Sequence, residues 1–311
     1  MMDRKMDVLC IGMALVDSII KGFNPEPVSA SGYTAASGTL NVGGEAVNEA
    51  VAAAKLGMRT GILCSLGQDP AGDMIINDLE KNGVDTSLVI RDPGRSTPVT
   101  TMFVNDDGTR KSVTNLAHRY NFRPERYVQK ISDARAIILG SLFRAPFDDA
   151  DIIYDVLSYA KSKGILTVAD TKLPNFVKMS LDDVRPALPY VDYITPNEDE
   201  AKYFTQKNDP EEMADVLLNY GVKNVIIKLG SKGCYFKNAD TAVKLDAMKI
   251  DAVDATGAGD NFVAGLTTEL LNGKTIEEAL KFANACGAIC TTAVGAGTAL
   301  KDYDQVLQSL L

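Results

Sequence analysis

The chain has 311 residues, of which 46% are hydrophobic and 23% charged, a composition typical of globular proteins. Its net charge of -9 and its isoelectric point of about 4.8 argue against nucleic acid or an anionic membrane surface as a partner. The apolar run near the N-terminus is too short for a signal peptide, and no segment approaches the length of a membrane span. We therefore expect a soluble, cytoplasmic protein.

The cysteines form no CxxC pair, and none has the companions that a metal site needs. Two of them are four residues apart, which places them on one face if the segment is helical. We expect all of them to be buried, reduced thiols. They are Cys10, Cys64, Cys234, Cys286 and Cys290.

The first part of the chain mixes strand and helix patterns. Gly108 in the run Asn-Asp-Asp-Gly can supply the positive φ of a hairpin turn, so the strands on either side should pair. The segment 15–42 is irregular and predicts only short extended pieces. In chain order we expect a strand at 7–13, an Ala-rich helix at 44–56, a strand at 59–66, a helix at 71–82, and strands at 97–104 and 110–116.

From residue 121 onward, short apolar strands alternate with helical patterns, which predicts parallel pairing with right-handed crossovers. We therefore expect one α/β domain over 1–311, with a largely parallel central sheet flanked by helices. The β-rich insertions at about 13–42 and 97–118 could cover one end of that sheet. The expected strands are 136–139, 166–169, 193–195 and 225–228, with antiparallel strands in 230–249; the expected helices are 150–163, 199–204, 211–219, 261–271 and 276–293.

The stretch VDATGAGDNFVAGL places small residues between two carboxylates and then turns apolar at helical spacing. Gly257 and Gly259 leave backbone amides bare near a helix start, where an anion can bind. Asp260 beside them could accept a proton from an attacking hydroxyl, as the base of a kinase must. A glycine-rich turn with Asp260 as a first-turn dipole partner explains the same spacing equally well.

Neither common nucleotide fingerprint, the Walker A sequence or a GxGxxG after a strand, occurs in the chain. Instead, DATGAGD at 254–260 resembles the C-terminal signature of the ribokinase-like (PfkB) carbohydrate kinases, with Ala255 in place of the usual Thr. NVGGEAVNEA at 41–50 is similar to the N-terminal motif of that family, and GQDPAG at 67–72 and TPNEDE at 195–200 resemble two more of its motifs. These matches span nearly the whole chain in the expected order.

The resemblance implies a ribokinase-like fold with a small β-lid, and transfer of phosphate from ATP to a sugar hydroxyl. Asp260 matches the catalytic base of the family, and Gly257, Ala258 and Gly259 match its anion hole. Asn197 and Glu200 match the motif that helps to place hydrated Mg²⁺, although a solvated helix residue is the ordinary alternative for Glu200.

The same resemblance implies a sugar site near the N-terminus. Asp17 matches the aspartate that holds sugar hydroxyls, and Gly43, Gly44 and Asn48 match the sugar-contacting motif. Glu45 stands where members vary with substrate. The alternatives are a loop cap for Asp17 and an ordinary helix residue for Asn48.

On the nucleotide side, KLGSKG at 228–233 resembles a strand-to-turn motif of the family, which assigns Lys228, Gly230 and Gly233 to ATP. Asn284 aligns with a helix position that borders adenine, or is simply polar on an amphipathic helix. Lys172 belongs to a D-x-K sequence whose lysine can approach the transferred phosphate, or is solvated.

Some members bind a monovalent cation beside the anion hole, and here Asp254 with the loop 293–297 could hold K⁺. Asp254 could equally cap the turn. The single histidine, His118, offers no metal site. The resemblance further implies that the lid pairs two copies into a homodimer.

The substrate is less defined than the reaction. Glu45 and Asp17 favour a neutral sugar or polyol, whereas Arg95, Arg110, Arg119 and Arg144 keep a sugar acid open. A nucleoside kinase is the alternative enzyme, which an aromatic wall of Tyr33 or Phe103 would favour. A sugar or ATP sensor without chemistry is the alternative from another class, but it would not need Asp260.

Overall fold

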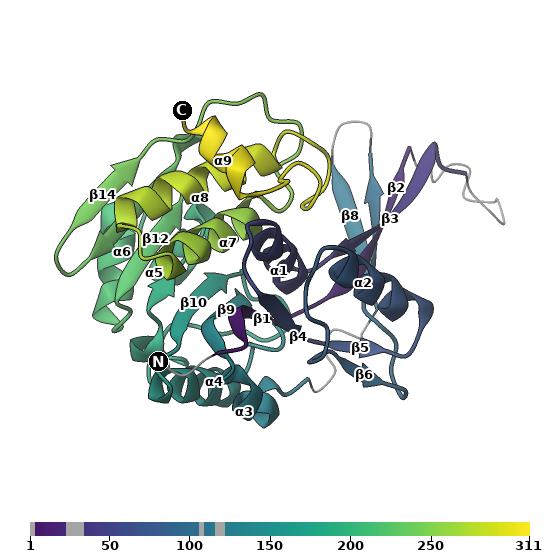
Figure 1. The fold of residues 1–311 in the computed structure, drawn as a ribbon, viewed down its shortest axis with the longest axis horizontal. Helices are drawn as coiled ribbons and strands as arrows, with labels where there is room; N and C mark the ends of the chain where they lie inside the picture. Colours follow the sequence, from purple (N-terminus) through teal and green to yellow (C-terminus); the bar gives the residue numbers. More distant parts are fainter. Residues whose placement is uncertain (1–3, 23–33, 106–108, 116–121) are drawn as a thin grey trace.

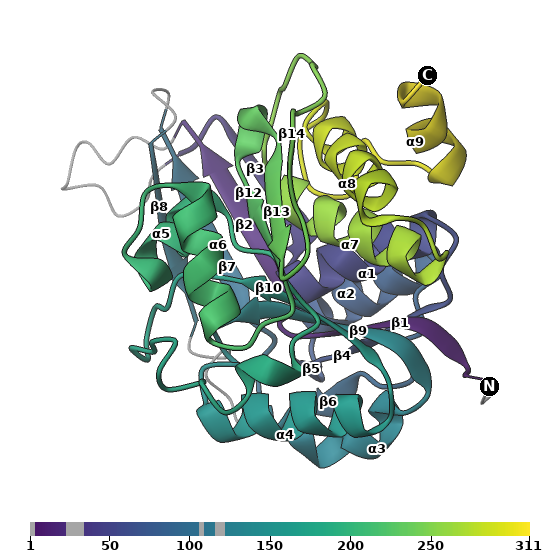
Figure 2. The ribbon, with the colours of Figure 1, turned by 90° about the vertical axis from the view of Figure 1, so that its left-hand side faces the viewer.

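A computed structural model describes residues 4–22, 34–105, 109–115 and 122–311. The described chain builds an eight-stranded sheet in the order β14-β13-β12-β11-β10-β9-β1-β4. Helices α1, α7 and α8 cover one face of this sheet, and α4, α5 and α6 cover the other (Figures 1 and 2). The predicted α/β architecture with a largely parallel central sheet is therefore confirmed.

In this sheet, neighbouring strands pair in parallel from β4 through β1, β9, β10 and β11 to β12. Strands β13 and β14 complete the sheet in antiparallel orientation. The parallel strands are buried on both faces, which explains their continuous apolar runs. The strands are β1 (Met6–Ile11), β4 (Thr60–Leu63), β9 (Ala134–Leu142), β10 (Leu166–Thr171), β11 (Tyr193–Ile194), β12 (Asn224–Lys228), β13 (Cys234–Asn238) and β14 (Ala242–Leu245).

The helices end within a few residues of their predicted bounds, except for α9 and the short α3, which the sequence did not predict. Among the described residues, no helix is long and apolar enough to span a bilayer. The helices are α1 (Glu45–Lys55), α2 (Pro70–Lys81), α3 (Val128–Ile131), α4 (Ala150–Ser162), α5 (Glu198–Thr205), α6 (Pro210–Asn219), α7 (Ala258–Leu271), α8 (Ile276–Cys290) and α9 (Tyr303–Ser309), with 3-10 turns at Pro124–Tyr127, Leu188–Tyr190 and Gly230–Lys232.

Two apolar cores hold the layers together, one on each face of the sheet. The first joins the sheet to α4 and α6, and the second joins it to α1, α7 and α8. As predicted, the cysteines are buried and unpaired, and Cys286 and Cys290 lie one turn apart on α8. The thiols therefore serve as core residues.

A second sheet, in the order β3-β2-β7-β8, stands beside the first (Figure 1). Its strands come from the two predicted insertions: β2 (Leu15–Lys21) and β3 (Ser37–Gly43) from one, β7 (Val99–Val104) and β8 (Arg110–Thr114) from the other. The extended pieces expected in 15–42 are present as β2 and β3, and they are more regular than expected, since they form a ladder of seven residue pairs. A separate pair, β5 (Ser65–Gly67) and β6 (Ile90–Asp92), lies below the second sheet in the view of Figure 1.

The topology leaves an open edge at the carboxyl ends of the parallel strands. After β1 the chain places β4 on one side of that strand and later β9 on the other, so the direction of winding reverses at β1. Ligands of open α/β sheets bind at such a reversal. Helix α1 begins at this edge after Gly44, whose φ of 103° suits glycine and where an added Cβ would lie 2.5 Å from the Met13 carbonyl oxygen.

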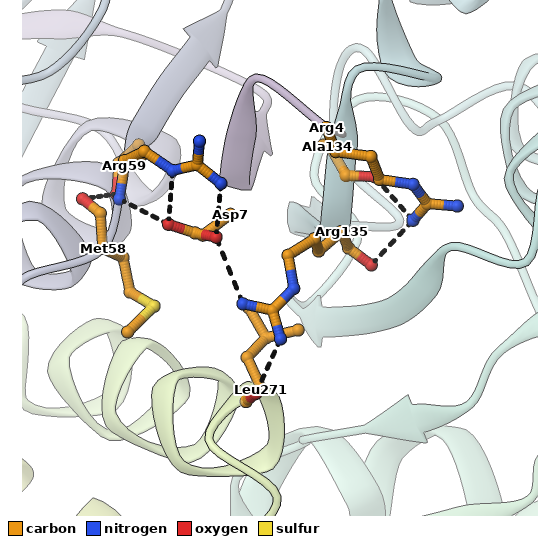
Figure 3. A network of polar contacts seen from close by, with 8 residues as sticks. Arg4, Asp7, Met58, Arg59, Ala134, Arg135 and Leu271 are labelled. Atoms are coloured by element: carbon orange, nitrogen blue, oxygen red, sulfur yellow. Dashed lines mark hydrogen bonds and ion pairs between the residues drawn. The ribbon is translucent and has the colours of Figure 1, made fainter. Parts of the chain in front are cut away.

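The opposite edge is closed by a buried carboxylate (Figure 3). Arg59 donates to both oxygens of Asp7 at 3.0 and 3.1 Å, and Arg135 donates to Oδ1 of Asp7 at 3.2 Å. Arg135 also donates to the Leu271 carbonyl oxygen at 2.7 Å, so the network ties the last residue of α7 to the sheet. Hydrogen bonds from Arg59 lower the pKa of Asp7 to about 2. Helix α7 is thus anchored at the end that lies away from the open edge.

Candidate active site

The turn before α7 requires glycine at its first position. Gly257 caps the helix with φ 78°, and a Cβ there would overlap Ala296. Of the three amides predicted to bind an anion, that of Ala258 already donates to the Ala255 carbonyl oxygen at 3.2 Å. The turn therefore presents its glycine backbone, together with the positive end of the α7 dipole, to the open edge.

Asp260 lies in the first turn of α7 and is 7% exposed. Asn48 on α1 donates from Nδ2 to its Oδ2 at 2.6 Å, which brings the predicted base and the predicted sugar ligand together. Burial raises the pKa of Asp260 to about 6, since the opposing charge of Lys172 and the Asn48 hydrogen bond offset it only in part. A carboxylate with this pKa can accept a proton near neutral pH.

Glu45 and Lys172 form an ion pair, with 3.0 Å between Nζ and Oε1. Burial opposes ionisation of Glu45, but the charge of Lys172 outweighs it and lowers the pKa of the carboxyl group. The same pairing raises the pKa of Lys172 against the effect of burial. Lys172 is thus held at the site by an opposite charge and is not a freely solvated side chain.

Asp17 comes from the second sheet, where it lies in β2 opposite Asn41 of β3, so it is not a loop cap. A Cβ added at Gly43 would lie 2.7 Å from its Oδ2, and the glycine therefore leaves room for the carboxylate. Burial, followed by the charge of Glu45, raises the pKa of Asp17 to about 6. The predicted sugar ligands Asp17, Gly43 and Glu45 thus lie close together.

Lys228, at the end of β12, is likewise paired with a buried carboxylate. Its Nζ donates to Oδ1 of Asp170 at 2.6 Å, and the Thr195 hydroxyl donates to the same oxygen at 2.7 Å. A Cβ added at Gly259 would lie 3.2 Å from Nζ of Lys228, so the ammonium group lies beside the glycine turn. The geometry therefore supplies a positive charge where a phosphoryl group could approach the turn.

Asn197 and Glu200 form a capping box at the start of α5. Oδ1 of Asn197 accepts the Glu200 amide, and Oε2 of Glu200 accepts the Asn197 amide and the Thr171 hydroxyl, at 2.8 to 2.9 Å. Glu200 is buried, which excludes the solvated alternative. Among the described residues, no group of three His, Cys, Asp or Glu side chains converges on a metal position. These oxygens are engaged by protein donors, which fits contact with a hydrated ion better than direct ligation.

The remaining predicted nucleotide residues lie together beyond Lys228. Gly230 and Gly233 have φ of 58° and 89°, and a Cβ at Gly233 would overlap the Leu245 carbonyl oxygen. Asn284 donates weakly to the Asp246 carbonyl oxygen at 3.4 Å and so joins α8 to the same segment. In the part of the chain that the structure describes, no hydrogen bond joins Gly230, Gly233 or Asn284 to Asp260, so these three residues form a separate part of the site.

The Asp254 carboxylate joins the turn before α7 to the loop after α8. It accepts hydrogen bonds from the amide and hydroxyl of Thr256 and from the amide of Gly295, at 2.7 to 3.0 Å. The cap explains its place before the glycine turn, and the K⁺ site at this position stays a prediction.

Two buried acids beside the site were not predicted from the sequence. Asp170, which positions Lys228, is the first residue of the D-x-K sequence, whose resemblance points to the lysine alone. Glu49 is buried next to the site within an Ala-rich helix, and nothing in its local pattern distinguishes it. His118, Arg119 and Tyr33 lie outside the described residues.

Comparison with known proteins settles the family. The model of the pfkB family carbohydrate kinases matches residues 5–302. The chain belongs to the PfkB family. Fructokinase-2 of Oryza sativa subsp. japonica is 31% identical, over 83% of this chain and 81% of its own length. This PfkB protein is accordingly a sugar phosphotransferase.

Solved structures agree with the ribokinase-like fold of this PfkB protein. The crystal structure of a ribokinase from Thermotoga maritima has a TM-score of 0.82 and 26% identity, and the match covers 98% of this chain and 99% of that one. A ribokinase of Arabidopsis thaliana, solved with ribose and ATP, has a TM-score of 0.85 and 24% identity over 98% of both chains. The motifs quoted above therefore lie on the fold that they implied.

Proposed function

We propose that this protein transfers the γ-phosphoryl group of ATP to a hydroxyl of a neutral sugar, with Asp260 as general base. The observation that carries the proposal is the contact between Asp260 and Asn48 at the glycine turn of α7. It joins a base, a polar sugar ligand and an anion-binding backbone in one place. The ATP-bound ribokinase relative supports ATP as the donor.

In the proposed reaction, the Asp260 carboxylate removes the proton of the sugar hydroxyl as its oxygen attacks the γ-phosphorus. The bond from that phosphorus to the β–γ bridging oxygen breaks, and ADP leaves. Lys228 and Lys172 lie close enough to Asp260 to influence it electrostatically, and we place them against the transferring group. Electrostatic stabilisation of this kind is the main task of a phosphoryl-transfer site.

Gly230, Gly233 and Asn284 are proposed to border the nucleotide. Mg²⁺ would neutralise charge on the ATP phosphates, and Asn197 and Glu200 are proposed to contact its water shell. Asp254 is retained as the residue to test for K⁺ activation.

The second sheet, from segments 13–42 and 97–118, is proposed to act as a lid over the sugar within a single domain over 1–311. Asp17 lies in this sheet, so closure of the lid would bring the Asp17 carboxylate to the sugar and exclude water from the site. Exposed Leu40 and Val113 on its outer strands favour pairing of two lids in a homodimer, which light scattering can test.

A neutral sugar such as fructose or ribose fits the charges better than a sugar acid does. Glu45 and Asp17 line the proposed sugar site, and Lys172 is engaged by Glu45. Two of the arginines that could bind a sugar acid have protein partners: Arg95 pairs with Asp92, and Arg144 donates to the Leu173 carbonyl oxygen.

The test is ADP release with Mg²⁺-ATP across a panel of ribose, fructose, other pentoses and hexoses, 2-keto-3-deoxygluconate and nucleosides. We expect a neutral sugar to give the strongest signal. A nucleoside as the preferred acceptor would replace the sugar proposal with the nucleoside kinase alternative. Silence across the panel with ATP binding intact would favour a sensor.

A further inference from the structure

Glu49 is a buried acid that the proposed reaction does not use. It follows Asn48 on α1 and is 0% exposed. Neither of its carboxyl oxygens has a hydrogen-bond partner among the described residues. A Cβ added at Gly140 would lie 2.9 Å from its Oε2, so the side chain points toward the end of β9. By contrast, Asp260, Asp170 and Glu200 each accept a hydrogen bond.

The charges around Glu49 are mostly negative. An ionised Glu49 would be repelled by three further carboxylates, and the ammonium group of Lys228, which favours its ionisation, is already engaged by Asp170 at 2.6 Å. Burying an unpaired carboxylate is strongly unfavourable, and neutralisation is the usual outcome. Burial, and then these carboxylates, raise the pKa of Glu49 well above its ordinary value. The groups that face it are Glu45 on α1, Asp170 on β10, Asp260 on α7, Lys228 on β12 and Cys10 on β1.

A proton is the simplest group that can neutralise this side chain. A metal ion requires several ligands, and in the described ranges no three His, Cys, Asp or Glu side chains converge on one position. A proton requires no second ligand. The neutral acid also fits against Gly140 without a counter-charge.

We infer that Glu49 stands as an uncharged carboxylic acid next to the Asn48–Asp260 pair. The inference rests on the proposed role of Asp260 as the base. A neutral Glu49 fills the space between α1 and β9 without adding charge. An ionised one would make Asp260 harder to ionise and would repel the incoming phosphoryl group.

The kinetic test is Glu49→Gln, which keeps the size of the side chain and is uncharged at every pH. We expect kcat at about pH 7 to stay within about threefold of wild type, because one neutral polar group replaces another. The acid limb of the kcat profile, set by Asp260, should stay at the same pH. If Glu49 were ionised in the wild type, its removal would shift that limb to lower pH. Such a shift, or a loss of kcat beyond about 100-fold in folded protein, would overturn the inference.

An infrared measurement tests the protonation without relying on activity. The difference spectrum of wild type minus Glu49→Gln, at about pH 8, should show the C=O band of a protonated carboxyl group, since Asp260 and Asp17 are then mostly ionised. Glu278→Gln, at an exposed cap of α8, is the matched control and should show no such band. Absence of the band in the Glu49 difference spectrum overturns the inference.

If Glu49→Gln does not fold, wild type with ¹³C-labelled glutamate carboxyl groups takes its place. An isotope-shifted band that persists at about pH 8 supports the inference, and its absence overturns it. Failure of the proposed function would be seen separately, as no sugar-dependent ADP release by the wild type or full activity of Asp260→Asn.

Discussion

Asn48 and Asp260 are 212 residues apart in the chain, yet Nδ2 of Asn48 lies 2.6 Å from Oδ2 of Asp260. The contact joins the first helix of the chain to the glycine turn of α7, across the point where the sheet reverses its winding. Each partner alone has an ordinary structural explanation. Their contact at the open edge is what makes a base beside a sugar ligand the better interpretation.

Replacing this base should remove turnover and leave nucleotide binding. For Asp260→Asn we expect kcat to fall by about 10²- to 10⁴-fold or more, because the amide cannot accept the hydroxyl proton. ATP affinity, measured by calorimetry, should change little. Asp209→Asn is the matched control, since Asp209 caps α6 away from the site and asparagine caps equally well. Near-normal turnover of Asp260→Asn would refute the assigned role.

The elevated pKa of Asp260 should set the pH range of activity if Asp260 is the base as proposed. The base must be ionised to accept a proton, so kcat should hold above about pH 6 and fall about tenfold per unit below it. Asp17 has a similar pKa, so its protonation should act in the same range on the sugar KM. Initial rates at saturating sugar isolate Asp260. A flat kcat profile down to about pH 4 would contradict its role as the base.

The sequence predicted those parts of the site that lie in compact motifs. The turn at 254–260 and the helix after it, the GG-x-x-x-N start of α1 and the N-x-x-E start of α5 can each be read within a few residues. The N-x-x-E spacing also fits a capping box, which is what Asn197 and Glu200 form. A local pattern thus located the helix start, while its role toward Mg²⁺ came only from resemblance.

Pairings between distant segments could not be predicted in this way. Nothing around Glu45 indicates Lys172 as its partner, and nothing around Lys228 indicates Asp170, because strand order in the sheet creates both contacts. The same holds for β2 and β3, whose irregular sequence becomes regular only through seven cross-strand pairs. Glu49 is the extreme case, since its surroundings come from five other elements, β1, β9, β10, β12 and α7.

The ion pair between Glu45 and Lys172 should determine whether the site prefers neutral or anionic sugars. Glu45→Lys places two ammonium groups together, so we expect the KM of neutral sugars to rise and preference to shift toward anionic sugars. Glu45→Gln removes the acid without adding a charge and is the control. The measurement is kcat/KM for fructose, ribose and 2-keto-3-deoxygluconate. An unaltered substrate profile in Glu45→Lys would show that this position does not select.

Gly257→Ala should impair both stability and catalysis. The positive φ costs about 1–2 kcal/mol for alanine, and the new Cβ would overlap Ala296 and move the turn. Gly273→Ala separates the two effects, because its φ is 75° but its Cβ would meet nothing within 4 Å. Urea denaturation and kcat should show a stability loss in both variants and a loss of kcat in Gly257→Ala alone. Equal kcat values would argue against an anion-binding turn.

Asp7→Asn tests the anchor at the other end of α7 (Figure 3). Asp7 is largely buried but Arg59 and Arg135 are about half exposed to screening water, so we expect a loss of about 1–3 kcal/mol in the free energy of unfolding. The pKa of Asp7 is lowered to about 2, so its contribution is complete above about pH 4 and declines as pH falls toward 2. Urea denaturation of wild type and variant should therefore differ at neutral pH and converge in acid. Asp73→Asn, from an exposed pair with Arg91, should lose at most about 0.5 kcal/mol. A loss that small for Asp7→Asn, or one that does not shrink in acid, would show that Asp7 does not anchor α7 through its charge.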